Sequence, residues 1–112
     1  MGLWEDAQRL LETLQSVGAR LGAFRGSPVQ REYTEHLQRR LVPLVEDLRL
    51  LINKRTDHSE ILGAMAEIKA VMYEVNGAAT KGEMDIFPEG LLNRFWQLST
   101  IFQGERYRDE RL

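Results

Sequence analysis

The chain of 112 residues contains no cysteine. It therefore forms no disulfide, and it has neither a thiolate nucleophile nor the sulfur ligands of a zinc–thiolate site. No uninterrupted apolar run approaches the ~20 residues of a membrane-spanning helix. Glu5 and Asp6 stand where a secretory signal would carry positive charge and then an apolar run. We therefore expect a soluble cytoplasmic protein with no membrane span.

A strong excess of charge of one sign is missing as well. Lysine and arginine number 15 and aspartate and glutamate 17, so the formal net charge is -2. Such a chain has no overall field that would attract nucleic acid or anionic lipid. One segment carries a set of basic side chains interleaved with acidic ones, namely Arg31, Arg39, Arg40, Lys54 and Arg55. A solvated helix face is the simpler interpretation of this set, and we expect no tight nucleic-acid binding.

Signatures of catalysis and metal binding are a third absence. Lys81 precedes Gly82, whereas a phosphate-binding P-loop needs its lysine directly after the glycine. Neither His36 nor His58 has a glutamate three positions before it, as a carboxylate-bridged di-iron bundle requires. Glu32 and His36 lie one helical turn apart, and a solvated pair explains them better than a weak surface metal site. We predict no catalytic residue, no cofactor and no metal.

The sequence does contain apolar side chains at helical spacing, in four segments. We expect helices at about 3–24, 28–54, 58–76 and 88–103. The first shows a four-three alternation at Leu3, Ala7, Leu10, Leu14, Val17, Leu21 and Phe24. The connections are short to moderate, so the predicted fold is all-α: a single-domain antiparallel bundle of four principal helices over 1–104. Residues 105–112 form a charged C-terminal tail.

The second segment has a clear start and an interior proline. Ser27, Pro28 and Gln30 match a capping box with proline at the first helical position. Pro43 removes one backbone hydrogen bond and crowds the preceding turn, so it either kinks the helix or breaks it. The apolar stripe keeps its phase across Pro43. We therefore predict a kinked but continuous helix.

Glycines at positions 18, 22 and 26 are spaced by four near the end of the first segment. One interpretation is a helix that frays towards Gly26, because each interior glycine costs roughly 1 kcal/mol relative to alanine. The other is a flat ridge where a second backbone approaches closely. We favour fraying.

The third segment has a possible cap at Asp57 and Glu60, and Asn76–Gly77 is a typical helix end. The connection 77–90 that follows is long enough for a functional loop, and an ordinary crossing between helices explains it equally well.

The fourth segment has an unusually broad apolar face. Its main stripe is Leu91, Phe95, Leu98 and Phe102, and Leu92, Trp96 and Ile101 flank it. These seven residues span roughly 220° of the helix, against ~100° or more for a surface helix. Such a face is covered either by another chain or by parts of its own, such as the 77–90 connection or the first helix. We predict a partner interface comprising Leu92, Trp96, Ile101, Trp4 and Leu11.

Three functions are compatible with these patterns. The leading hypothesis is a non-catalytic helical protein–protein interaction or assembly module, acting as a homo-oligomer or as a small subunit of a larger complex. The second is a small all-α enzyme or ligand-binding protein that uses the 77–90 loop and the glycine-rich end of the first helix. The third is a regulator that contacts nucleic acid through the basic side chains of the second helix.

Overall fold

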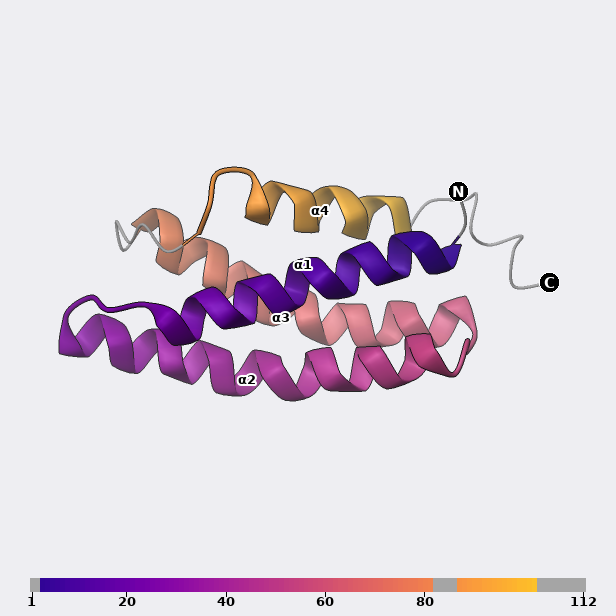
Figure 1. The fold of residues 1–112 in the computed structure, drawn as a ribbon, viewed down its shortest axis with the longest axis horizontal. Helices are drawn as coiled ribbons and strands as arrows, with labels where there is room; N and C mark the ends of the chain where they lie inside the picture. The colour runs from indigo at the N-terminus through magenta and orange to yellow at the C-terminus, as the bar shows by residue number, and fades with distance from the viewer. Residues whose placement is uncertain (1–2, 82–86, 103–112) are drawn as a thin grey trace.

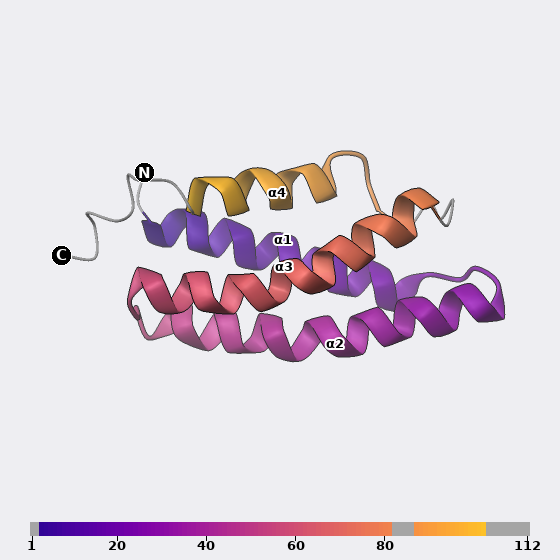
Figure 2. The same cartoon turned by 180° about the vertical axis from the view of Figure 1, so that it is seen from behind.

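The computed structural model describes residues 3–81 and 87–102, which form four α-helices (Figure 1). The helices are α1 (Leu3–Ala23), α2 (Pro28–Asn53), α3 (His58–Lys81) and α4 (Leu91–Phe102). Each runs antiparallel to the next, as Figures 1 and 2 show from opposite sides. The prediction of an all-α antiparallel bundle is confirmed. The predicted tail, 105–112, lies outside the described residues.

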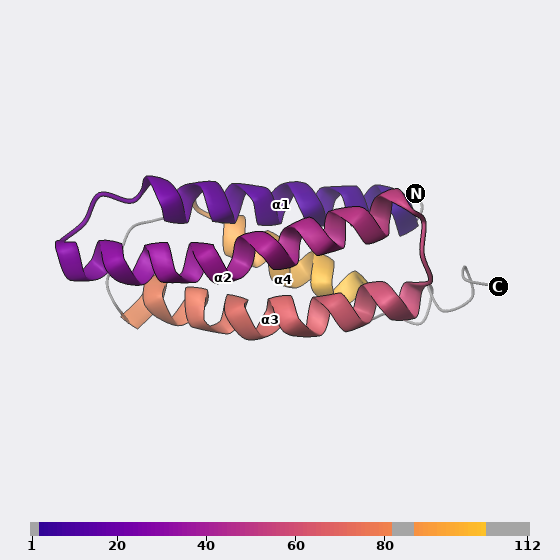
Figure 3. The ribbon, with the colours of Figure 1, turned by 90° about the horizontal axis from the view of Figure 1, so that it is seen from below.

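The four helices are not packed equally. α1 packs against both α2 and α4, and α2 packs against α1 and α3, whereas α3 and α4 contact each other much less. Figure 3 shows α2 between α1 and α3, with α4 behind them. α4 has 12 residues and the other helices 21 to 26. The bundle is therefore closed tightly on three sides and loosely along the side between α3 and α4.

The core consists of the apolar stripes of all four helices. Its largest fully buried side chains are Phe95, Leu10, Leu14, Leu21, Leu37, Leu41, Leu48, Ile61, Met65 and Ile68. Burying one such side chain contributes about 1.5–3 kcal/mol relative to leaving it in water. Most of the stability of these helices therefore comes from packing between them and less from helix propensity.

The start of α2 matches the predicted capping box. The Gln30 amide donates to the Ser27 hydroxyl oxygen at 3.2 Å, and the Ser27 amide donates to the Gln30 side-chain oxygen at 2.9 Å. The helix then continues without interruption through Pro43 to Asn53. Its axis changes direction near the middle, as Figure 3 shows. The predicted continuity is therefore confirmed, and the exposed position of Pro43 lets the neighbouring stripe stay buried.

The glycines of α1 make room for a side chain of α2. The helix remains regular through Gly18 and Gly22 and ends at Ala23. The Gln38 side-chain amide donates to the Gly18 carbonyl at 3.0 Å. A Cβ atom at Gly22 would lie only 2.2 Å from the same amide nitrogen. The close neighbour is therefore a glutamine side chain, and not the second backbone that the ridge interpretation required.

Two predicted helix boundaries are wrong. α3 continues past Asn76–Gly77 to Lys81. Ala78 packs into the core, and its burial favours another helical turn. α4 begins at Leu91 and not at Pro88, since Gly90 has a φ of 85°, in the left-handed region that interrupts a helix. The Gly90 carbonyl accepts the first helical hydrogen bond, from the Arg94 amide at 2.9 Å.

Replacing the interior proline tests how much the bend of α2 matters. Pro43→Ala should raise the free energy of unfolding by about 1 kcal/mol, a part of the ~3 kcal/mol that separates proline from alanine inside a helix. The gain is partial because the helix has already bent around the ring. Urea denaturation measures it, with Glu35→Ala as an exposed control on the same helix. A loss of stability would show that the bend is needed to pack α2 against α1.

A pair of glycine substitutions tests the role of Gln38. Gly63→Ala places its Cβ in open space on α3 and should stabilise the protein by about 1 kcal/mol. Gly22→Ala should give little or no gain, because Gln38 must move and lose its hydrogen bond to Gly18, worth about 1 kcal/mol. Thermal and urea denaturation of both variants measure the difference. Equal stabilisation at both positions would contradict the assigned role of Gln38.

Candidate functional site

The five residues predicted to form one interface lie in separate places. Leu11 is only 3% exposed and belongs to the core, so its side chain is not available to a partner. Trp4 lies in the first turn of α1. Leu92 and Trp96 are half-buried on α4 and pack against the core, while Ile101 is 37% exposed. The fold thus separates a set that the helical pattern alone had grouped.

The Trp4 ring contacts the turn between α2 and α3. The Arg55 guanidinium carbon lies 4.9 Å from the centre of the Trp4 ring, which is a cation–π contact. Arg55 itself has a φ of 54°, unusual for a residue with a side chain. Two backbone hydrogen bonds hold this turn, from Arg55 to the Ile52 carbonyl at 3.1 Å and from Thr56 to the Leu51 carbonyl at 3.2 Å. The Trp4 ring therefore packs beside the turn between α2 and α3.

Trp96 lies where α4 meets α3. Its ring centre is 4.8 Å from that of Tyr73 on α3, with the rings tilted by 39°, and 4.9 Å from that of Phe95 in an edge-on arrangement. The Tyr73 side chain is 64% exposed although it touches another large ring. Tyr73 of α3 thus covers part of the Trp96 ring. The sequence analysis had considered another chain, the 77–90 connection or the first helix for this place, and not α3.

We call the set Tyr73, Leu92 and Trp96 the α3–α4 edge. Leu92 precedes Trp96 by one helical turn and so shares its side of α4. The two helices are otherwise in weak contact, and the Tyr73–Trp96 ring pair joins them. The edge therefore presents apolar and aromatic surface, which suits recognition of another surface more than a chemical reaction.

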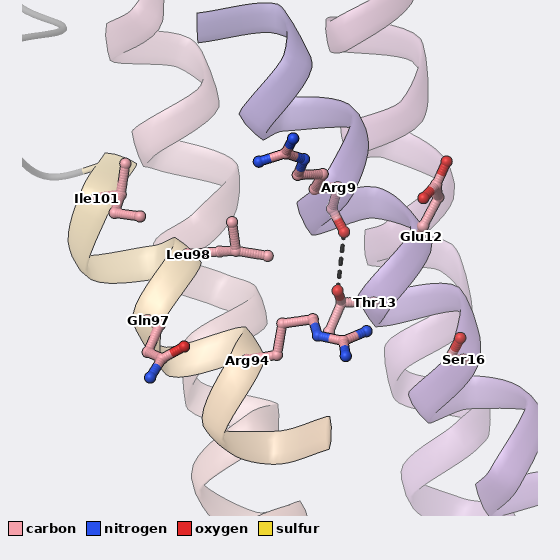
Figure 4. Close-up of a pocket in the computed structure, with 8 residues that line it drawn as sticks. All are labelled: Arg9, Glu12, Thr13, Ser16, Arg94, Gln97, Leu98 and Ile101. Atoms are coloured by element: carbon pink, nitrogen blue, oxygen red, sulfur yellow. Dashed lines mark hydrogen bonds between the residues drawn. The ribbon is translucent and has the colours of Figure 1, made fainter. Parts of the chain in front are cut away.

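The opposite side of α4 forms a groove with α1. This α1–α4 groove has a volume of about 540 Å³ (Figure 4). It is lined by Arg9, Glu12, Thr13, Ser16, Arg94, Gln97, Leu98 and Ile101. Six of these eight residues are polar, so the groove differs in chemistry from the α3–α4 edge. Ile101 belongs to this groove and Trp96 to the other side of the helix.

A smaller and more apolar cavity, of about 210 Å³, lies between α1 and α2 beside Gly18 and Gln38. It lies near the glycine-rich end of α1, which the second functional hypothesis proposed as part of a ligand site. Its volume is below the roughly 300–1,000 Å³ typical of small-molecule sites. The other part of that predicted site, the 77–90 loop, includes residues 82–86, which lie outside the described residues.

The inward faces of the helices carry polar residues that the sequence analysis missed. They are Asp6, Thr13, Thr34, His58 and Ser99. The threonine hydroxyls donate to backbone carbonyls of their own helices, Thr13 to Arg9 at 2.8 Å and Thr34 to Arg31 at 3.0 Å. Their spacing could have predicted the burial of three of them. Positions 6, 10, 13 and 17 are separated by four, three and four residues, and positions 34, 37 and 41 by three and four, as inward-facing helix positions are.

Some of the basic side chains in and after α2 have partners within the chain. Arg40 forms an ion pair with Glu74 of α3, and Arg55 lies over Trp4. On the surface of α2, Arg49 forms hydrogen bonds with the Glu46 carboxylate, at 3.0 Å to one of its oxygens. That hydrogen bond lowers the pKa of Glu46 and raises the pKa of Arg49 relative to their ordinary values. Two of the four arginines of α2, Arg40 and Arg49, therefore pair with acidic side chains.

Within residues 3–81 and 87–102, no group of three or more metal-ligating side chains is close enough to hold an ion. Glu32 and His36 thus have no third ligand in that part of the chain. Among the described helices, none has the length and apolar character to cross a bilayer. Comparison with protein-family models, curated proteins and solved structures finds no match. The function must therefore be inferred from the surfaces themselves.

The charge arrangement predicts the outcome of a nucleic-acid binding assay. Labelled duplex and single-stranded oligonucleotides should show no sub-micromolar binding by fluorescence anisotropy at physiological salt, because the basic residues of α2 are interleaved with acids and partly paired. A tight isotherm that weakens steeply with salt would contradict this expectation. It would favour the hypothesis of a nucleic-acid regulator.

Proposed function

We propose that this chain is a non-catalytic helical protein–protein interaction module that associates through the α3–α4 edge. The observation that supports the proposal is the ring pair of Tyr73 and Trp96, with Tyr73 64% exposed, on the loosely packed side of the bundle. Exposed clusters of large apolar side chains mark interaction sites in soluble proteins.

The chemistry of the edge suits a protein surface. Tyrosine and tryptophan dominate the binding energy of many interfaces, because they bury a large area and lose little conformational entropy. The two rings already contact each other in the free chain, so their positions are partly set before a partner arrives. Leu92 lies one turn from Trp96 and extends the apolar surface along α4.

A second copy of this chain is the partner that we propose. Two-fold symmetric dimers are the commonest assemblies, and they use one self-complementary patch on both subunits. The α3–α4 edge combines two antiparallel helices, so a two-fold axis can place α3 of one copy beside α4 of the other. Figure 1 shows that α3 extends beyond the start of α4 at its C-terminal end.

Truncation of the exposed ring gives the clearest test. Wild-type protein should show a mass that rises with concentration towards twice the 13.0 kDa of one chain, measured by light scattering after size exclusion. Tyr73→Ala should weaken this association by about 1–2 kcal/mol, because an interface tyrosine is lost. It should cost little stability, since the ring is mostly exposed. Tyr33→Ala, which removes a 39% exposed tyrosine from α2, is the matched control and should associate normally.

Trp96→Ala tests the interface role and the core role of this ring together. Trp96 is half-buried and packs on Phe95, so this variant should lose both association and some thermal stability. A wild-type protein that stays monomeric at all concentrations would reject self-association. A Tyr73→Ala variant that still associates like wild type would show that the α3–α4 edge is not the interface.

A further inference from the structure

The cavity beside Gly18 and Gln38, which we call the α1–α2 recess, has the size of one small ring. Its volume of about 210 Å³ is too small for most metabolites. An apolar protein cavity of roughly 150 Å³ is nevertheless large enough to bind benzene. The recess therefore suits a single aromatic ring or a short branched hydrocarbon.

The floor of the recess is apolar and can be reached from solvent. Leu14 and Leu41 line it and are fully buried, and Val45 is only 7% exposed. Val42 also belongs to the lining, but its side chain is 51% exposed and so lies at the rim. A hydrocarbon placed on this floor would remove its own apolar surface, and that of Val42, from water.

Gly18 contributes to the space by lacking a side chain. It is buried in the interior of α1, where glycine destabilises a helix relative to alanine. A Cβ atom built there would lie 4.0 Å from a methyl carbon of Val42, which is an ordinary van der Waals distance. Packing therefore permits alanine at Gly18, in contrast to Gly22, where the Gln38 amide is in the way. A local rule broken without a packing reason is typical of functional sites.

Gln38 offers the recess a hydrogen-bond acceptor in a fixed position. Its Nε2 donates to the Gly18 carbonyl at 3.0 Å, so the amide is held between α2 and α1. In the part of the chain that the structure describes, the Oε1 atom of the same amide accepts no hydrogen bond. Because an amide oxygen can accept two hydrogen bonds, it can receive the hydroxyl group of a ligand.

The charge at the recess favours a neutral ligand. Among the described residues, Glu46 is the charged member of the lining. Its carboxylate accepts a hydrogen bond from Arg49 at 3.0 Å, which lowers the pKa of Glu46 and keeps it ionised. The carboxylate repels an anionic ligand, and its pairing with Arg49 reduces the attraction for a cationic one.

We propose that the α1–α2 recess binds a small neutral alcohol or phenol, a single ring or short branched hydrocarbon with one hydroxyl group. The hydrocarbon would lie on Leu14, Leu41 and Val45, and the hydroxyl would donate to Gln38 Oε1. α1 and α2 are already packed together, as Figure 3 shows, so the site needs no large rearrangement to form.

The test uses phenol, toluene and benzoate on the full chain. Titrations followed by methyl chemical shifts in NMR spectra should show saturable binding of phenol in the millimolar range. Ring-current shifts should centre on the methyl groups of Leu14, Leu41, Val42 and Val45. Benzoate should bind at least about tenfold more weakly than phenol, since its charge would face Glu46.

Two glycine variants form a matched pair. Gly18→Ala and Gly63→Ala both add a methyl group to a helix that has room for it, so both should raise the melting temperature. Only Gly18 lines the recess. Gly18→Ala should therefore weaken phenol about threefold, and the larger Gly18→Val about tenfold, whereas Gly63→Ala should bind like wild type. Circular dichroism verifies that each variant is folded.

A variant of Gln38 tests the hydroxyl contact. Gln38→Met removes the acceptor and keeps a side chain of similar length, so it should weaken phenol about fivefold. Toluene has no hydroxyl group, and its affinity should stay within about twofold of wild type. Retained toluene binding would also show that the recess still exists in this variant.

Three results would overturn the proposal. These are the absence of saturable phenol binding, equal phenol affinities in Gly18→Ala and Gly63→Ala, and an equal loss of phenol and toluene in Gln38→Met. The Tyr73→Ala variant should bind phenol like wild type, since Tyr73 belongs to α3 and contacts α4. Failure of the recess and failure of the α3–α4 association are therefore distinguishable.

Discussion

The packing of α4 against α1 decides the shape of both candidate surfaces. Phe95 is fully buried and Leu98 nearly so, and these side chains hold a helix of only 12 residues to the bundle. Apolar burial of this kind has no direction of its own, so the helix settles where the largest area leaves water. The result is that α4 contacts α1 closely and α3 only lightly. One side of α4 borders the groove, and the other carries Trp96, whose half-buried ring touches the exposed ring of Tyr73.

The two sides of α4 differ in chemistry. The α3–α4 edge carries rings and a leucine, whose binding energy comes from removing apolar area from water. The α1–α4 groove carries two guanidinium groups, whose interactions depend on charge and directed hydrogen bonds and weaken as salt screens them. Trp96 and Arg94 are two residues apart on one helix, and yet they lie on surfaces of different chemistry.

The buried polar residues show that the core is not uniformly apolar. Thr13 and Thr34 satisfy their hydroxyls on carbonyls of their own helices, so they occupy core positions without needing a partner from another helix. Gln38 works differently, because its amide crosses from α2 to the Gly18 carbonyl of α1. A hydrogen bond between two helices fixes their relative position along the axis, which apolar contacts alone define only weakly.

The sequence by itself determined the four helices, most of their ends and the apolar residues that face inward, because these depend on local spacing and capping. Local patterns of this kind predicted the capping box at Ser27 and Gln30 and the continuity of α2 through Pro43. They also predicted the apolar stripes of α1 and α2. Local patterns did not predict the end of α3 or the start of α4. Core packing of Ala78 overrides the helix-end signal at Asn76–Gly77, and the conformation of Gly90 delays the start of α4 past Pro88. Periodicity also identified the flanks of α4, with Trp96 and Ile101 on opposite sides. Only the tertiary structure decided which neighbour each flank meets, because the side of a helix that faces a particular partner depends on contacts between residues far apart in the chain. That choice placed Tyr73 against Trp96, buried Leu11 in the core and set Arg94 beside α1.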